Sequence, residues 1–210
     1  MENCNTIYAE LKKRIINLDY KPGELLNEKE LINEFNVSRT PIREALLKLS
    51  EKGLVNFIPR VGIYVSQIEL KNIKNIYEIK KNLEALSAEL ASQRATKEEG
   101  QELINIAHRI ESYDAKEDFQ KIIRDDKLFH RKTSEFSRNE NLISILDDIN
   151  GETARFLQHI NYVIDEPDWF NSSVMAIANA IADGDKERAS IEAEKHTVVF
   201  LKKLSKIFFT

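Results

Sequence analysis

The sequence predicts a mainly α-helical chain, with three short helices and a β-hairpin at the N-terminus followed by an all-α bundle. Three of its four prolines fall within the first sixty residues, where short apolar stretches alternate with turns. Between about residues 69 and 166 the chain has no proline, and its apolar residues recur at helical spacing. This change predicts two domains, residues 1–68 and residues 69–210.

The N-terminal domain begins with two expected helices. Apolar residues at helical spacing mark the first over about residues 7–18, and the Lys-Pro-Gly segment at 21–23 ends it with a turn. Asn27, followed three residues later by Glu30, resembles a capping box, in which each side chain bonds the other residue's backbone N–H. This pattern predicts a second helix that ends at Asn36.

A third helix and a hairpin complete this domain. Ser38 is placed to cap the helix, a proline is tolerated in its first turn, and Gly53 ends it. Residues 54–58 and 63–65 are β-prone runs around a Pro/Gly turn, which predicts a hairpin. The buried stripe of the third helix is expected to consist of Ile42, Leu46 and Leu49.

Two helices joined by a tight turn and followed by a hairpin form a winged helix-turn-helix, which presents its second helix to the major groove of DNA. The third helix opens with Arg39, Thr40 and Arg43, where an arginine can bond guanine or a phosphate beside the N–H groups of the helix N-terminus. The tip of the hairpin offers a further arginine and a glycine to the minor groove. The residues expected to contact DNA are Lys29, Ser38, Arg39, Thr40, Arg43, Arg60 and Gly62.

The net charge of the chain is −4, which by itself disfavours a nucleic-acid partner. The distribution of the charge indicates otherwise. Residues 1–68 carry 10 basic and 9 acidic side chains, whereas the remainder carries 21 and 26. Residues 37–63 hold five basic against two acidic side chains, so any DNA-binding surface is expected there.

The C-terminal domain is expected to be a bundle of about six helices. The first runs from about residue 70 to residue 93, and Thr96 with Glu99 forms a capping-box pattern before the second. The same periodicity predicts helices near residues 118–137, 140–164, 170–182 and 186–208.

Composition narrows the setting in which the protein works. Cys4 is the only cysteine, which excludes an intramolecular disulfide and a cysteine-rich zinc site. The first thirty residues lack the apolar stretch of an export signal, and no apolar run approaches the roughly 20 residues that span a bilayer. We therefore expect a cytoplasmic protein with no membrane partner.

Three segments of the N-terminal domain resemble the signature of the GntR family of transcriptional regulators. They are Tyr-Lys-Pro-Gly-Glu-Leu-Leu at 20–26, Val-Ser-Arg-Thr-Pro-Ile-Arg-Glu-Ala-Leu at 37–46, and Gly-Leu-Val at 53–55. The C-terminal part is similar to that family's FadR-type, or FCD, ligand domain, through Leu83-Glu84, Asp126 to His130, Asn139 to Leu142 and Ala180 to Asp185. The resemblance implies a homodimer that binds double-stranded operator DNA and alters this binding when a small carboxylated metabolite enters the helical domain.

A candidate metal site lies in the C-terminal domain. Asp126 and His130 are four residues apart on one expected helix and share a face, where a carboxylate and an imidazole can meet one cation. In metal-binding members of the FCD group two more histidines join them, of which His196 matches one and Val174 replaces the other. The remaining ligands can still hold Zn²⁺ or a similar ion with water or an effector carboxylate. The alternative is that both histidines are hydrogen-bonded residues of the bundle, with Asp126 as partner.

Two basic residues are candidates for effector binding. Lys80 stands four residues before Glu84, where the family motif has arginine, so the charge is kept but the bidentate fork that suits a carboxylate is lost. Arg155, on the helix expected near 140–164, is the second candidate, and a surface or structural role is its alternative.

Two other functions compete with that of a regulator. A metal-dependent hydrolase would use Asp126, His130 and His196, but a hydrolytic zinc site usually needs a nearby general base, and no His-Glu-x-x-His or comparable motif occurs. A ligand-binding bundle whose winged domain makes only protein contacts is compatible with the acidic overall charge. The sequence favours a regulator that is not an enzyme.

Overall fold

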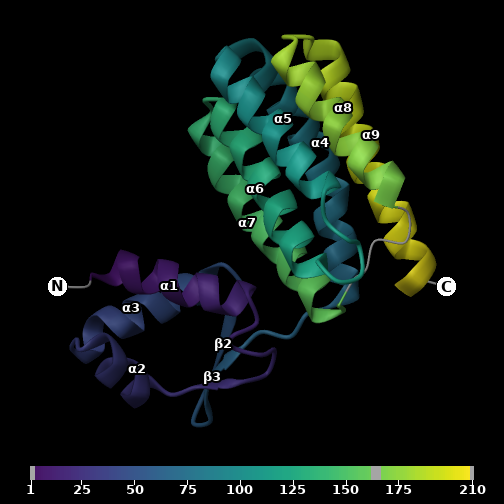
Figure 1. Ribbon diagram of the computed structural model, residues 1–210. Coiled ribbons are helices and arrows are strands. Elements are labelled where there is room, and N and C mark those ends of the chain that lie inside the picture. The colour runs from purple at the N-terminus through teal and green to yellow at the C-terminus, as the bar shows by residue number, and fades with distance from the viewer. Residues whose placement is uncertain (1–2, 162–166, 209–210) are drawn as a thin grey trace. The chain divides into compact units, whose positions relative to one another are not determined.

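The computed structural model describes residues 3–161 and 167–208 of the chain (Figure 1). The chain divides into two compact units, Met1–Glu69 and Leu70–Thr210. Nine α-helices and three short strands occur within the described residues, and all three strands belong to the N-terminal unit. The predicted fold class is confirmed.

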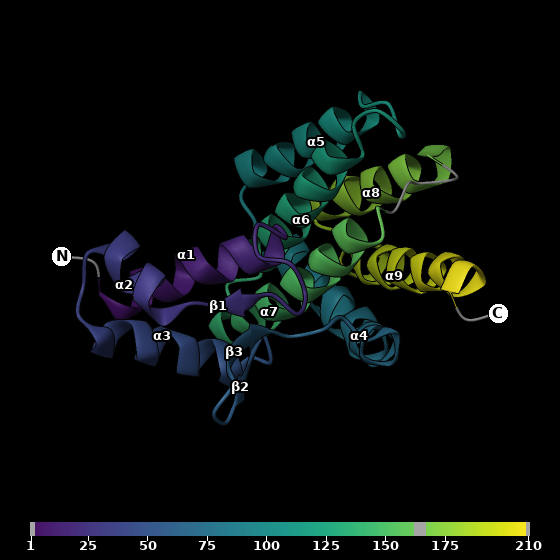
Figure 2. The same ribbon diagram turned by 90° about the horizontal axis from the view of Figure 1, so that it is seen from below.

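The N-terminal unit follows the predicted order of helices. Helix α1 (Cys4–Ile16) packs on α3 (Arg39–Glu51), and α2 (Glu28–Phe35) precedes α3 across a tight turn (Figure 2). Asn36 ends α2 in the left-handed conformation, with φ 51, which asparagine adopts more readily than most residues. The stripe of α3 is buried as predicted, with Ile42, Leu46 and Leu49 inaccessible to solvent and Ala45 beside them.

Two helix starts differ in detail from the capping patterns. Asn27 caps α2 by accepting a hydrogen bond from the N–H of Lys29. Glu30 accepts a bond from the side chain of Asn27 rather than from its backbone, so the reciprocal box is not formed. Ser38 is the N-cap residue of α3, but its side chain makes no capping hydrogen bond. Ser38 is exposed, and its side chain does not cap the helix.

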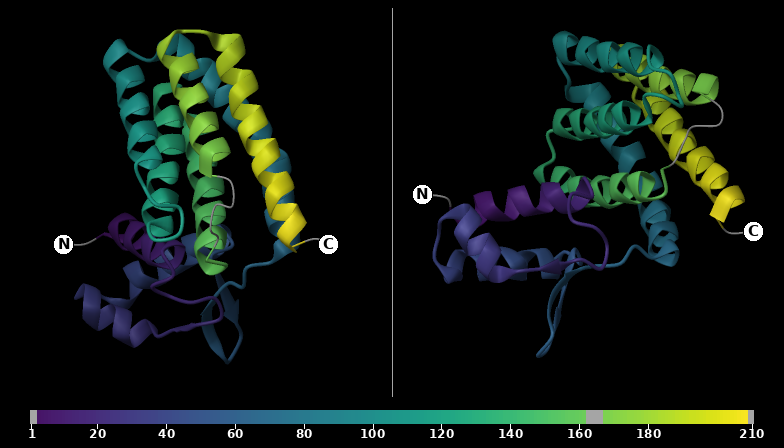
Figure 3. Two further views of the ribbon diagram at one scale, coloured as in Figure 1. Left: turned by 45° about the vertical axis from the view of Figure 1, so that its right-hand side comes forward. Right: turned by 60° about the horizontal axis from the view of Figure 1, so that its bottom comes forward.

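The hairpin belongs to a larger sheet than the sequence predicts. Strands β2 (Val55–Ile58) and β3 (Gly62–Val65) pair antiparallel, with Ile58 opposite Gly62. A third strand, β1 (Leu25–Leu26), pairs with the other side of β3 and gives the order β1-β3-β2. Two residues are too few to show the alternation that identifies a strand in a sequence. The β2–β3 hairpin extends beyond the helices of its own unit (Figure 3).

The C-terminal unit is a helical bundle. Its helices in the described part of the chain are α4 (Leu70–Arg94), α5 (Lys97–Glu111), α6 (Phe119–Phe136), α7 (Glu140–His159), α8 (Pro167–Ala182) and α9 (Lys186–Phe208). Helix α4 packs along α9, α5 along α8 and α6 along α7. Thr96 and Glu99 form the predicted reciprocal capping box before α5. The helix expected near 140–164 ends at His159, and residues 162–164 of that expectation lie outside the described residues.

No helix in the described ranges is both long enough and apolar enough to cross a membrane.

Candidate functional site

The three predicted metal ligands meet inside the C-terminal unit. Asp126 and His130 lie one turn apart on α6, and His196 comes from α9. One ligand atom of each lies within 4.8 Å of the other two. Both imidazoles are buried, and their ring centroids are 5.7 Å apart. The spacing of Asp126 and His130 on one face of a helix therefore places them as the sequence predicts.

A buried carboxylate that is absent from the predicted site orients His130. Nδ1 of His130 lies 3.0 Å from Oε2 of Glu84 on α4, and Nε2 lies 3.5 Å from Oδ1 of Asp126. A carboxylate on one ring nitrogen is the usual way in which proteins orient a metal-binding histidine. Burial favours the neutral form of Glu84, but the charges and hydrogen bonds of His130 and Lys80 outweigh it and hold the pKa of Glu84 well below its usual value.

His196 is oriented by α8. Oγ of Ser173 lies 2.8 Å from its Nδ1, which leaves Nε2 as the nitrogen available to a ligand. Burial, aided by the charges of His130 and Lys80, lowers the pKa of His196 to about 3, so the imidazole is neutral, the form that binds metals. The neighbouring Val174, which replaces a histidine of the family pattern, is buried on the same helix. Ser173 has no sequence signature, because a serine gains this role only from the packing of α8 on α9.

The cluster lines a cavity of ≈ 30 Å³ that is partly open to solvent. This is space for two or three water molecules or for a metal ion, because a single water needs about 10–15 Å³. Its other polar lining residues are Lys80, Lys127, Asn150, Thr153 and Thr197. Arg155 is buried on α7, but it is not among the described residues that line the cavity.

Two polar atoms of the cavity wall have no hydrogen-bond partner among the described residues. They are Oδ1 of Asp126 and Nδ2 of Asn150. Leaving a buried polar group unpaired costs about 1–3 kcal/mol, so such atoms are rare and point to a missing partner. Burial also raises the pKa of Asp126, and His130 and Lys80 only partly offset it. A carboxylate oxygen that accepts no hydrogen bond and lies beside two imidazoles is a donor set that suits a divalent cation, so these residues fit such an ion.

Lys80 is the predicted effector contact that lines the cavity. Its ammonium is buried, lies 2.8 Å from Oε1 of Glu84 and also bonds Oδ1 of Asn150. The positive charge is therefore compensated by a carboxylate of the same helix. Glu84 thereby contacts both His130, a candidate metal ligand, and Lys80, a candidate effector-binding residue.

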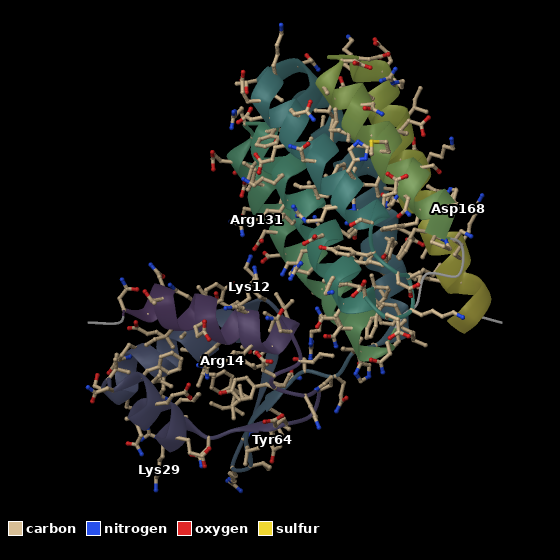
Figure 4. The ribbon with its side chains drawn as sticks, in the orientation of Figure 1. Lys12, Arg14, Lys29, Tyr64, Arg131 and Asp168 are labelled. Atoms are coloured by element: carbon tan, nitrogen blue, oxygen red, sulfur yellow. The ribbon has the colours of Figure 1, made fainter. Side chains whose placement is uncertain are left out.

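The second candidate site is the start of α3. The side chains of Arg39 and Arg43 are 66% and 55% exposed. Ile42 and Leu46, which lie between and after them, point into the core of the N-terminal unit. The helix is thus anchored by its aliphatic face while its first two arginines are exposed. Lys29 projects from the start of α2 (Figure 4).

Two further predicted DNA contacts, Ser38 and Thr40, are exposed at the start of α3, and the hairpin tip carries the last two. Arg60 is exposed and has φ 65, a left-handed conformation that is unfavourable for residues other than glycine. Gly62 has φ 151, and a Cβ added to it would lie 2.7 Å from Cδ1 of Leu25. The backbone conformation therefore favours glycine at this position whether or not DNA approaches it, whereas Cδ1 of Leu25 belongs to an exposed side chain that can move aside.

Two family models match the chain. Residues 3–65 match the model described as bacterial regulatory proteins, gntR family, and residues 75–198 match that of the FCD domain. The two matched segments fall in the N-terminal and C-terminal units respectively.

Relatives of known sequence and structure agree with these matches. The chain is 36% identical over 160 residues to the HTH-type transcriptional regulator YdhC of Bacillus subtilis (strain 168), covering 75% of this chain and 70% of that protein. It is 31% identical over 149 residues to the Nta operon transcriptional regulator of Aminobacter aminovorans, covering 70% of this chain and 69% of that protein. The structure of E. coli McbR/YncC matches with a TM-score of 0.82 and 20% identity over 99% of both chains, which supports the fold.

Proposed function

This chain belongs to the GntR family of bacterial regulatory proteins and carries an FCD domain, and on that premise we propose how its residues perform the regulation. The protein is a transcriptional regulator rather than an enzyme, and the FCD domain is the part that binds a small-molecule effector. The relatives YdhC and the Nta operon regulator are named as regulators, which leaves the hydrolase alternative without support.

We propose that α3 enters the major groove of operator DNA. The observation that carries this proposal is the start of α3, where Arg39 and Arg43 are exposed and Ile42 is buried. Such arginines can bond guanine O6 and N7 or flanking phosphates. Around them, the proposed interface includes further exposed or partly exposed residues, namely Lys29, Ser38, Thr40, Arg60 and Gly62.

We further propose that two copies of the chain act together as a homodimer in the cytoplasm. A dimer places the α3 helices of its two copies roughly 34 Å apart, which is one turn of B-DNA, and so reads a palindromic operator. Such an arrangement is typical of the family to which the chain belongs.

In the helical unit we propose a divalent metal ion, such as Zn²⁺, held by Asp126, His130 and His196. The support is that Oδ1 of Asp126 accepts no hydrogen bond and lies beside two imidazoles whose Nδ1 atoms are already engaged. Because Val174 replaces a fourth ligand, water or an effector carboxylate would complete the coordination. When bound, the ion supplies a Lewis-acidic anchor for a carboxylate.

Lys80 and Arg155 are the proposed effector contacts, of which Lys80 lines the cavity. The cavity of ≈ 30 Å³ is too small for a metabolite of several heavy atoms. Such a metabolite therefore enters the cavity fully only if lining side chains move and widen it. An effector that prefers this widened form shifts the balance between it and the narrow form of the protein. This coupling is what allows binding in one unit to alter DNA binding by the other.

Selection of bound duplexes from random DNA tests the proposal. We expect a short palindromic consensus, whose affinity falls linearly with the logarithm of salt concentration because phosphate contacts release counterions. Small carboxylates should then weaken or strengthen binding to that duplex at constant salt. A chain that enriches no sequence would contradict the proposal and favour a winged unit that makes only protein contacts.

A further inference from the structure

One carboxylate lies between the two arginines that open α3. Oε2 of Glu28 is 3.1 Å from Nη2 of Arg39, with which it forms a hydrogen bond. Oε1 of Glu28 is 3.0 Å from Nε of Arg43 and forms an ion pair without an aligned hydrogen bond. A single acidic side chain on α2 therefore contacts both cations that the proposed function assigns to DNA.

Glu28 is more firmly placed than its two partners. It is the first residue of α2, next to the capping Asn27, and its side chain is only 20% exposed. The side chains of Arg39 and Arg43 are more than half exposed, and a free arginine side chain populates many rotamers. A fixed carboxylate that contacts both arginines reduces this freedom before DNA arrives. Less conformational entropy is then lost on binding.

The contact with Glu28 leaves Arg43 able to read bases. Arg43 approaches Glu28 through Nε, so its two terminal Nη groups remain for another acceptor. A pair of guanidinium N–H groups is what bonds O6 and N7 of guanine. Arg39 and Arg43 are also four residues apart on one face of α3, where two like charges repel each other. The carboxylate between them offsets that repulsion and keeps both side chains on the same side of the groove.

We propose that Glu28 is a positioning residue for DNA recognition, which holds Arg39 and Arg43 in the arrangement that reads operator bases. The inference rests on the proposed function of α3. The negative charge of Glu28 weakens the general attraction of this surface to phosphate, because it cancels part of the positive charge of the arginines. Glu28 therefore increases the discrimination between operator and other DNA rather than the total affinity.

The substitution Glu28→Gln tests this proposal, with Glu51→Gln as the matched control at the exposed C-terminal end of α3. Two probes are needed, a duplex that the wild-type chain has selected from random DNA and a scrambled duplex of equal length and composition. For Glu28→Gln we expect the ratio of the two affinities to fall about 10-fold or more, the effect of one lost bidentate base contact. Glu51→Gln should leave the ratio unchanged.

Other outcomes separate the alternatives. If Glu28→Gln raises both affinities equally and keeps their ratio, Glu28 only repels phosphate and the proposal is overturned. If the wild-type chain selects no duplex, the proposed function has failed first. A double-mutant cycle with Arg43→Ala distinguishes positioning from a general structural role, because Glu28→Gln should change the ratio less than about threefold once Arg43 is absent. Full additivity in that cycle would contradict positioning.

The fold of the variant must be verified by its thermal unfolding. Should Glu28→Gln fail to fold, Glu28→Asp carries the same test, because it keeps the charge but shortens the side chain so that one carboxylate no longer reaches both arginines. The ratio should then fall as well, although the net charge is unchanged. An unaltered ratio in a folded Glu28→Asp variant would overturn the proposal.

Discussion

Nδ1 of His130 lies 3.0 Å from Oε2 of Glu84, and this buried contact joins α6 to α4 inside the helical unit. The other oxygen of Glu84 binds the ammonium of Lys80 at 2.8 Å. One carboxylate thus organises a candidate metal ligand and a candidate effector contact. Changes at Glu84 should therefore affect both the metal and the effector, although Glu84 is proposed to touch neither.

Glu84→Gln should weaken metal binding about 10- to 100-fold, because it removes the anion that orients His130 and raises its basicity as a ligand. The measurement is a competition titration of Zn²⁺ against a chelator of known affinity. Glu78→Gln, at an exposed position of the same helix, is the control and should bind as the wild type does. Equal affinities for the two variants would show that the Glu84 contact is only structural.

Protein purified without a polyhistidine tag should contain about one divalent ion per chain, and His130→Ala should lose it. Removal of the ion with a chelator should lower the thermal midpoint, since a ligand that binds only the folded state stabilises it. Elemental analysis and a thermal scan provide the two readouts. Absence of metal after loading with stoichiometric Zn²⁺ would favour the hydrogen-bonded arrangement of Asp126, His130 and His196.

Arg43→Ala should cost about 1–3 kcal/mol of binding free energy for the selected operator if Arg43 reads a base. The loss of binding free energy should be smaller for operators that are already altered at the base that Arg43 contacts. A uniform loss for all duplexes would instead assign Arg43 to phosphate. Arg131→Ala removes an exposed arginine of the helical unit and serves as the control. Unchanged operator binding by Arg43→Ala would exclude Arg43 from the interface.

Arg60→Gly should stabilise the protein and weaken its binding to DNA. Arg60 has φ 65 in the turn closed by the bond from the N–H of Val61 to the carbonyl of Ile58, and the left-handed conformation costs a non-glycine residue about 1–2 kcal/mol. Denaturant unfolding should show a gain of about 1 kcal/mol, reduced by the greater freedom of glycine in the unfolded chain. A variant that is more stable and binds operator as tightly as the wild type would exclude Arg60 as a DNA contact.

Local patterns explain why much of the architecture is predictable from the sequence. The burial of Ile42, Leu46 and Leu49 follows from their spacing alone, and so does the shared face of Asp126 and His130. Both depend only on the period of one helix. The capping box of Thr96 and Glu99 is likewise a local pattern and forms as expected.

The parts that could not be predicted depend on pairs of distant elements. Glu28 contacts the arginines of α3 across the turn between α2 and α3. Glu84 on α4 contacts His130 on α6, and Ser173 on α8 contacts His196 on α9. No spacing rule links these residues, because their contacts depend on how the helices pack. Strand β1 was missed for the same reason, since only its pairing with β3 makes it a strand.

DNA reading by Arg39 and Arg43, on a helix anchored by its buried face, underlies every role proposed for the N-terminal unit. Its most direct test is a titration of the selected operator and a scrambled duplex with the variant Arg39→Ala/Arg43→Ala at several salt concentrations. We predict that the variant unfolds at the wild-type temperature but no longer distinguishes the two duplexes and shows a shallower dependence on salt. A folded double variant that discriminates between them as the wild type does would contradict the claim.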